Sequence, residues 1–115
     1  MSRILYILIT LTLLCLAQPL QADDPMKPAK ESAAIKEAKR LAKIGGTAIY
    51  CKEEPEIMNE FVDKARTHLL MLAKDKYDRV FATVDFKNLM TAFSVKKPDV
   101  KCEQTILDLK KFLRK

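Results

Sequence analysis

The sequence predicts an all-α fold: a small bundle of four to five helices held by one disulfide and preceded by a cleaved signal peptide. Three observations lead to this prediction. Apolar residues recur at three- and four-residue spacing along most of the chain after residue 31, as they do on the buried face of a helix. An apolar segment opens the chain, and two cysteines, Cys51 and Cys102, follow it. The one segment that alternates like a strand, residues 80–86, has no second strand to pair with.

The first 22 residues have the parts of a secretory signal peptide. Arg3 gives the positive start, residues 4–17 are apolar, and Ala22 is the small residue that a signal peptidase requires. The apolar run is shorter than the roughly 20 residues that a membrane-spanning helix needs. We therefore expect export, periplasmic or secreted, with cleavage after Ala22.

Removal of the signal changes the cysteine and charge counts. Cys15 follows Leu14 rather than the small residue that lipidation needs, so we assign it to the discarded signal and not to a lipoprotein anchor. The signal contains one of the 21 basic residues and none of the 15 acidic ones, which leaves a formal charge of +5. Two cysteines in an exported chain predict a disulfide between Cys51 and Cys102.

The chain after the signal is expected to hold one domain. Residues 23–30 contain two of the five prolines in a polar run, which indicates a flexible tail. Residues 31–115 then form a single helical domain, which by its size buries only about 60–65% of its unfolded surface. A disulfide that closes a loop of about fifty residues contributes roughly 4 kcal/mol in the loop-entropy model. That is a large part of a net stability of about 5–15 kcal/mol.

The first helix is expected to begin at Ser32, a residue that can cap a helix, and to end near Cys51. Its apolar stripe continues in phase through Gly45 and Gly46, the only two glycines. We expect one continuous helix, with the glycines allowing another helix to approach closely. The alternative is a helix that ends at a glycine cap.

A second helix is expected from Pro55, which suits the first helical turn, to about Lys74. The last helix is expected after Asp99, which can cap it, and Cys102 heads its apolar stripe. The disulfide should therefore join the last helix to the end of the first, from inside or at the edge of the core.

The segment between these two helices has two apolar faces. Its change of phase near Asp85 predicts either two short helices, with Asp85 as the N-cap of the second, or one helix buried on both sides. The first face consists of Tyr77, Val80, Phe81 and Val84, and the nearly opposite face of Phe86, Leu89, Met90 and Phe93.

The sequence contains no recognisable combination of catalytic residues. His68 is the only histidine, and no glycine-rich segment surrounds a serine or threonine. Both remaining cysteines are assigned to the disulfide. Two carboxylates suffice for a glycosidase, but the acidic residues of the segment 53–63 lie where the start of a helix favours negative charge. We expect neither enzymatic activity nor a cofactor.

His68 and Met71 are weak candidates for a metal site. They lie about one helical turn apart, and imidazole and thioether groups suit a soft metal such as copper(I). No third ligand is evident, and His68 shares the phase of the apolar stripe of its helix. We therefore expect a histidine at the edge of the core, and a soft-metal carrier is the least favoured function.

Leu70 and Met71 lie off the main apolar stripe of the second helix. Ordinary packing is the favoured interpretation of these residues and of the five methionines in general. The alternative is an adaptable apolar surface for a partner. Leu70 is the more informative residue, because its phase is opposite to the stripe.

Charge is unevenly distributed along the chain. Residues 27–43 carry six basic and two acidic residues, residues 96–115 carry seven and three, and residues 53–63 carry five acidic ones. Because the disulfide should bring the first and last helices together, we expect one positive face that suits an anionic partner. A solvated face without a function is the alternative. The residues assigned to this face are Lys36, Lys39, Arg40, Lys43, Lys110, Lys111, Arg114 and Lys115.

These observations favour an exported, non-enzymatic protein that binds another, acidic protein, such as an inhibitor, an immunity protein or a chaperone-like protein. In outline it is similar to small periplasmic proteins such as acid-stress chaperones and the immunity proteins that neutralise secreted cell-wall toxins. The alternative is a basic protein that binds the cell envelope or an anionic lipid surface. Nucleic acid is disfavoured, because the chain is exported and its basic residues lack interleaved exposed aromatic residues.

Overall fold

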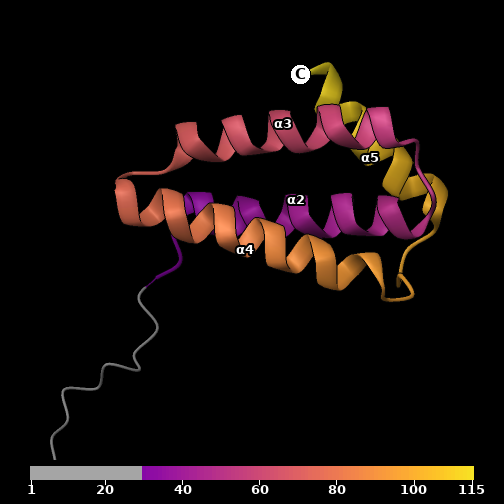
Figure 1. The fold of residues 1–115 in the computed structure, drawn as a ribbon, viewed down its shortest axis with the longest axis horizontal. Helices are drawn as coiled ribbons and strands as arrows, with labels where there is room; N and C mark the ends of the chain where they lie inside the picture. Colours follow the sequence, from indigo (N-terminus) through magenta and orange to yellow (C-terminus); the bar gives the residue numbers. More distant parts are fainter. Residues whose placement is uncertain (1–29) are drawn as a thin grey trace, which may run out of the picture. The chain divides into compact units, whose positions relative to one another are not determined.

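The computed structural model describes residues 30–115, which contain four α-helices and no strand. The all-α prediction is thereby confirmed. The predicted signal peptide, Cys15 and residues 23–29 of the predicted tail lie outside the described residues. The helices are α2 (Ala33–Tyr50), α3 (Pro55–Leu72), α4 (Lys76–Ser94) and α5 (Cys102–Arg114) (Figure 1).

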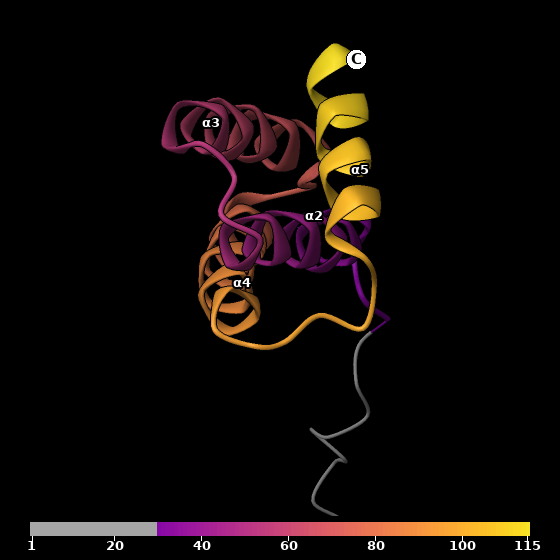
Figure 2. The ribbon, with the colours of Figure 1, turned by 90° about the vertical axis from the view of Figure 1, so that its right-hand side faces the viewer.

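Helix α2 lies at the centre of this arrangement and contacts α3, α4 and α5. In Figure 1, α3 and α4 lie on opposite sides of α2, and Figure 2 shows α5 running across it. Small side chains allow the other three helices to pack closely around α2. Most residues on the buried surface of α2 are alanine, glycine or threonine. These small buried residues are Ala34, Ala38, Ala42, Gly45, Gly46, Thr47 and Ala48.

Helix α2 continues through Gly45 and Gly46, so the alternative of a glycine cap is wrong. A Cβ atom at Gly46 would lie 2.4 Å from the Met90 carbonyl oxygen and 2.5 Å from the Phe93 Cβ atom. A Cβ atom at Gly45 would lie 2.6 Å from the ring of Phe61. The glycines therefore permit the close approach of α4 and of the Phe61 ring to α2.

Helix α2 ends instead at Tyr50, and Lys52, just beyond the C-cap residue Cys51, has a backbone φ of 62°. The Lys52 amide donates to the Ile49 carbonyl and the Glu53 amide donates to the Ala48 carbonyl, each at 3.0 Å. These two bonds form a Schellman motif, in which a left-handed residue follows the helix. The predicted end near Cys51 is thereby confirmed, although lysine occupies the left-handed position where glycine is usual.

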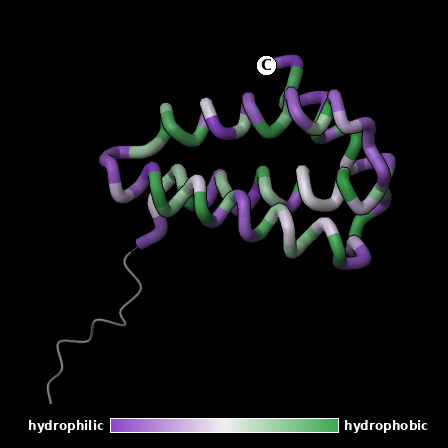
Figure 3. The backbone as a smooth tube through the Cα atoms, in the orientation of Figure 1, coloured by the Kyte–Doolittle hydropathy of each residue, from purple (hydrophilic) through white to green (hydrophobic). Residues whose placement is uncertain are grey.

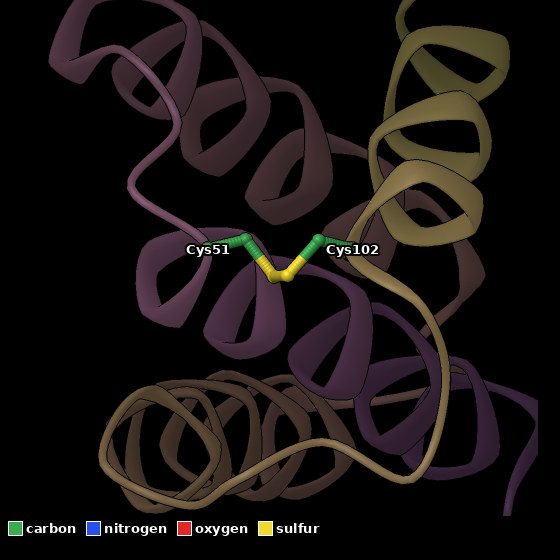
Figure 4. Close-up of a disulfide and its surroundings, with 2 residues drawn as sticks. All are labelled: Cys51 and Cys102. Carbon is green, nitrogen blue, oxygen red and sulfur yellow. A yellow bond between two sulfur atoms is a disulfide. The ribbon is translucent and has the colours of Figure 1, made fainter.

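The disulfide links Cys51, at the end of α2, to Cys102, at the start of α5, as predicted (Figure 4). The two Cα atoms are 5.7 Å apart. The prediction that Cys102 heads the buried stripe of the last helix is wrong, because Cys102 is exposed. The buried residues of α5 are Thr105, Leu109 and Phe112.

The predicted cap of the last helix is also wrong. Lys101 occupies the N-cap position of α5 without a side-chain hydrogen bond. Asp99 instead pairs with Lys43 of α2, with 3.3 Å between Nζ and Oδ1. At the end of α3, Ala73 has extended backbone angles, so this helix stops before the predicted Lys74.

Residues 76–94 form one helix, so the prediction of two short helices with Asp85 as the second N-cap is wrong. The true N-cap is Asp75, whose carboxylate accepts the Asp78 amide proton at 2.8 Å. Only the face of α4 that contains Ala82 and Phe86 is buried. The prediction of a helix buried on both sides is also wrong, because no other helix of residues 30–115 covers the opposite face.

Asp78 joins the first turn of α4 to the first turn of α2. The Ser32 hydroxyl donates to Asp78 Oδ1 at 2.5 Å, and its oxygen accepts the Ile35 amide proton. The Lys74 amide donates to Asp78 Oδ2 at 3.1 Å. The Ser32 hydrogen bond and then the Lys74 amide hold the pKa of Asp78 below its ordinary value. This network fixes the N-terminal half of α4 against the bundle.

Candidate functional site

The exposed apolar side chains of the described residues gather mainly at the end of α3 and in the first half of α4. Four of them form the α4 stripe, which we define as Tyr77, Val80, Phe81 and Val84, spaced i, i+3, i+4 and i+7. Tyr77 is 78% exposed, Val80 60% and Phe81 58%. Figure 3 shows apolar positions in successive turns of α4 and at the C-terminal end of α3.

Helix α3 extends this apolar surface. Leu70 is 48% exposed and lines a hollow of about 270 Å³ with Val80 and Val84 of α4. In the sequence, the helical phase of Leu70 is opposite to the apolar stripe of its helix. This phase places Leu70 on the exposed side of α3. Met71 is 80% exposed, so it lies on the surface and not in the core.

A second hollow continues the first between α3 and α4. It has a volume of about 240 Å³ and contains the apolar residues Val62, Phe86 and Met90. Thr83 lines both hollows, so they adjoin along the two helices. We call the two hollows together the α3–α4 groove.

Basic side chains border the α3–α4 groove. Arg66 and Lys87 line the inner hollow and Arg79 lines the outer one. No acidic residue lines either hollow. Within residues 30–115, none of these three basic side chains forms an ion pair with a carboxylate. The groove therefore combines an apolar floor with an uncompensated positive border.

The structure brings some residues of the predicted basic face together. Arg40 and Lys43 of α2 and Lys111 of α5 line one groove of about 480 Å³, and Lys115 lines a neighbouring hollow beside Arg40. Asp108 also lines the larger groove and reduces its positive charge. The predicted residues that line neither hollow are Lys36, Lys39, Lys110 and Arg114.

Acidic neighbours pair with three of the four basic residues predicted on α2. All three pairs lie at the surface, where an ion pair contributes only about 0–1 kcal/mol. They nevertheless lower the positive potential that an anionic partner would meet. The pairs are Lys39 with Glu31, Arg40 with Glu37, and Lys43 with Asp99.

Glu37 lies between Arg40 and His68. The Arg40 guanidinium donates to both Glu37 carboxylate oxygens, at 2.9 and 2.6 Å, and His68 Nε2 lies 3.3 Å from Glu37 Oε1. The hydrogen bond from Arg40 is the main cause that holds the pKa of Glu37 below its ordinary value. The same contact raises the pKa of Arg40. Arg40 and Glu37 therefore form an ion pair, and His68 lies beside the same carboxylate.

His68 also touches the core, since its ring lies edge-on to Phe112 with 5.8 Å between the ring centroids. With a side chain 40% exposed, it lies at the edge of the core. Its side chain interacts with Glu37 and Phe112, whereas Met71, its predicted partner in a metal site, is 80% exposed. Residues 30–115 contain no group of three histidine, cysteine, aspartate or glutamate side chains that could hold a metal ion.

Neither a family model, nor a curated protein, nor a solved structure matches the chain. Among the described residues, no helix has both the length and the apolar character needed to cross a bilayer. The site must therefore be interpreted from its own chemistry.

Proposed function

We propose that the protein is an exported, non-enzymatic interaction protein that binds another protein. Export rests on the first 22 residues of the sequence. Binding rests on one observation, the exposed α4 stripe. Its residues have the spacing of a buried helix face, yet none of the helices in residues 30–115 covers them.

The exposure of this stripe supports binding because apolar surface exposed to water is unfavourable by roughly 25 cal/mol per Å², and a partner that covers it would remove this cost. Single exposed apolar residues are common on soluble proteins, whereas a contiguous apolar patch usually marks an interaction site. The α4 stripe spans two helical turns and continues onto Leu70 of α3. A partner that covers it would remove four large side chains from water.

Capture from an envelope extract of the producing cell tests this function. The disulfide-intact protein, immobilised at low and at moderate salt, should retain one stoichiometric partner. The double variant Val80→Asp/Val84→Asp should lose that partner while it unfolds at the same temperature as the wild type. Capture of no stoichiometric partner by the wild type would contradict the proposal.

A second candidate function is binding to an anionic lipid or envelope surface. One observation favours it: five basic-face residues are exposed and form no ion pair within residues 30–115. Co-sedimentation with anionic vesicles at low and moderate salt is the test, and salt-insensitive failure to bind removes this candidate. The five residues are Lys36, Lys110, Lys111, Arg114 and Lys115.

A further inference from the structure

We propose that the α3–α4 groove and the adjoining α4 stripe bind an amphipathic helix of the partner whose apolar residues are flanked by acidic ones. This inference rests on the proposed function, because it names the kind of surface that the partner presents. It differs from the sequence-based prediction of the site, which assigned acidic partners to α2 and α5.

The apolar residues of the groove suit a helix of about two turns. Val62 and Leu70 mark the apolar positions of the groove on α3, and eight residues of helix span about 12 Å. A partner helix that presents apolar residues at i, i+4 and i+7 covers the same length. Leu70, Val80 and Val84 supply the exposed part of the floor, and Phe86 and Met90 the deeper part.

The border of the groove determines the charge of the partner. Arg66, Arg79 and Lys87 line the two hollows, no acidic residue does, and none of the three is paired with a carboxylate of residues 30–115. A helix with glutamate or aspartate beside its apolar residues would neutralise all three. A helix with lysine at the same places would meet like charges in a partly desolvated groove, which is costly.

The same border disfavours an antiparallel pairing of α4 with that of a second copy of this chain. On the helical wheel of α4, the margin of the stripe that faces α3 carries Lys76, Arg79 and Lys87. A two-fold antiparallel pairing of two stripes sets equal margins against each other, so Lys76 of one copy would approach Lys87 of the other. A parallel two-fold pairing instead sets this margin of one copy against the opposite margin of the other, so the lysines do not meet. Only the antiparallel arrangement brings these like charges together across an apolar interface.

Two synthetic helical peptides provide the probe. Both present leucine at i, i+4 and i+7, and the flanking residues are glutamate in one and lysine in the other. Binding to the purified, disulfide-intact protein is measured by calorimetry, and the contacted residues are located by chemical-shift changes. The glutamate peptide should bind at least about tenfold more tightly than the lysine peptide, with the largest changes at Leu70, Val80 and Val84, and high salt should reduce this difference.

A charge-reversal pair of variants separates the groove from general electrostatics. The triple variant Arg66→Glu/Arg79→Glu/Lys87→Glu should invert the preference between the two peptides. The control variant Lys36→Glu/Lys110→Glu/Lys111→Glu changes the net charge by the same amount on other surfaces, and it should leave the preference unchanged. Thermal unfolding of both variants verifies that they remain folded.

Several outcomes would overturn the inference. These are equal binding of the two peptides, binding of neither, a preference that the control variant inverts equally, or a stable dimer of the wild type that Val84→Glu dissociates. The proposed function fails separately, when the wild type captures no partner from the envelope extract. A captured partner that Val80→Asp/Val84→Asp also retains would leave protein binding intact and overturn the assignment of the groove.

Discussion

The two apolar faces of α4 look alike in the sequence but have opposite environments in the structure. Phe86 is 2% exposed and lies among the core residues, whereas Phe81, on the other face, is 58% exposed. Both faces have helical spacing and large side chains. Hydrophobic periodicity therefore identifies the faces of a helix, while the neighbouring helices decide which face is buried.

Packing against α2 determines which face of α4 is buried. The buried surface of α2 consists mostly of small residues, and Gly46 brings its backbone close to Met90 and Phe93. A close approach of this kind fixes α4 in one rotation about its axis, with Ala82 and Phe86 turned inward. The α4 stripe then faces away from the bundle, where the described chain has no segment to cover it.

The largest expected effect on stability comes from removing Phe86, and removal of Phe81 from the other face of α4 is the matched comparison. Phe86→Ala should lower the free energy of unfolding by about 3–5 kcal/mol, because it leaves a cavity beside Phe61. Phe81→Ala should change it by no more than about 0.5 kcal/mol. Urea unfolding of both variants measures the difference, and equal destabilisation would show that the α4 stripe is buried in solution.

Removal of the disulfide should have the next largest effect and should leave the two faces of α4 unchanged. The double variant Cys51→Ser/Cys102→Ser opens a loop of 51 residues, which corresponds to roughly 4 kcal/mol of stability. The link lies at the end of α2 remote from Ser32 and hence from the α4 stripe. The folded variant should therefore keep its affinity for the partner, measured below its unfolding temperature. Loss of binding by a variant that is demonstrably folded would connect the disulfide to the site.

A substitution at Gly46 should weaken the packing that selects the buried face. Gly46→Ala forces a Cβ atom against the Met90 carbonyl and the Phe93 side chain. We expect a loss of about 1–2 kcal/mol, since overpacking costs about 1–3 kcal/mol and the helix propensity of alanine returns up to about 1 kcal/mol. Unfolding in urea measures this loss, and a more stable variant would contradict the close approach of α2 and α4.

The smallest effect should come from the polar link that holds the start of α4. Ser32→Ala removes the N-cap of α2 and the hydrogen bond to Asp78, which should cost about 1 kcal/mol at neutral pH. Because the pKa of Asp78 is lowered in the folded protein, its contribution is complete above the ordinary aspartate pKa and is lost as the pH falls below it. Asp78→Asn should therefore flatten the decrease of stability below about pH 4, as unfolding at several pH values would show.

Local sequence patterns predicted α2 and α3 because each has a clear apolar stripe and a recognisable start, whereas the predicted break in α4 and the predicted cap of α5 were wrong. Ser32 is the N-cap of α2 and Pro55 is the first residue of α3, as predicted. With two cysteines after the predicted signal peptide, only one disulfide pairing was possible. The end of α2 was predicted close to Cys51, but the left-handed Lys52 that follows it was not, since a lysine in that conformation carries no local signal. The cap expected at Asp99 failed because a tertiary contact with Lys43 uses that side chain.

The candidate site was only partly accessible from the sequence. Leu70 stood out by its phase, and the α4 stripe was recognised as an apolar face but was assigned to the interior. Arg66 and Arg79 lie on different helices, and only their packing brings both to one groove. The basic residues of α2 form a cluster in the sequence, although Glu31, Glu37 and Asp99 pair with three of them.

The decisive measurement is the affinity of the captured partner for the wild type and for Val80→Asp/Val84→Asp, with the unfolding free energy of each protein. We expect the variant to keep its stability within about 0.5 kcal/mol and to bind at least about a hundredfold more weakly, since charged groups would replace two central apolar contacts. Unchanged affinity in an equally stable variant would contradict the claim that the exposed face of α4 is the binding surface.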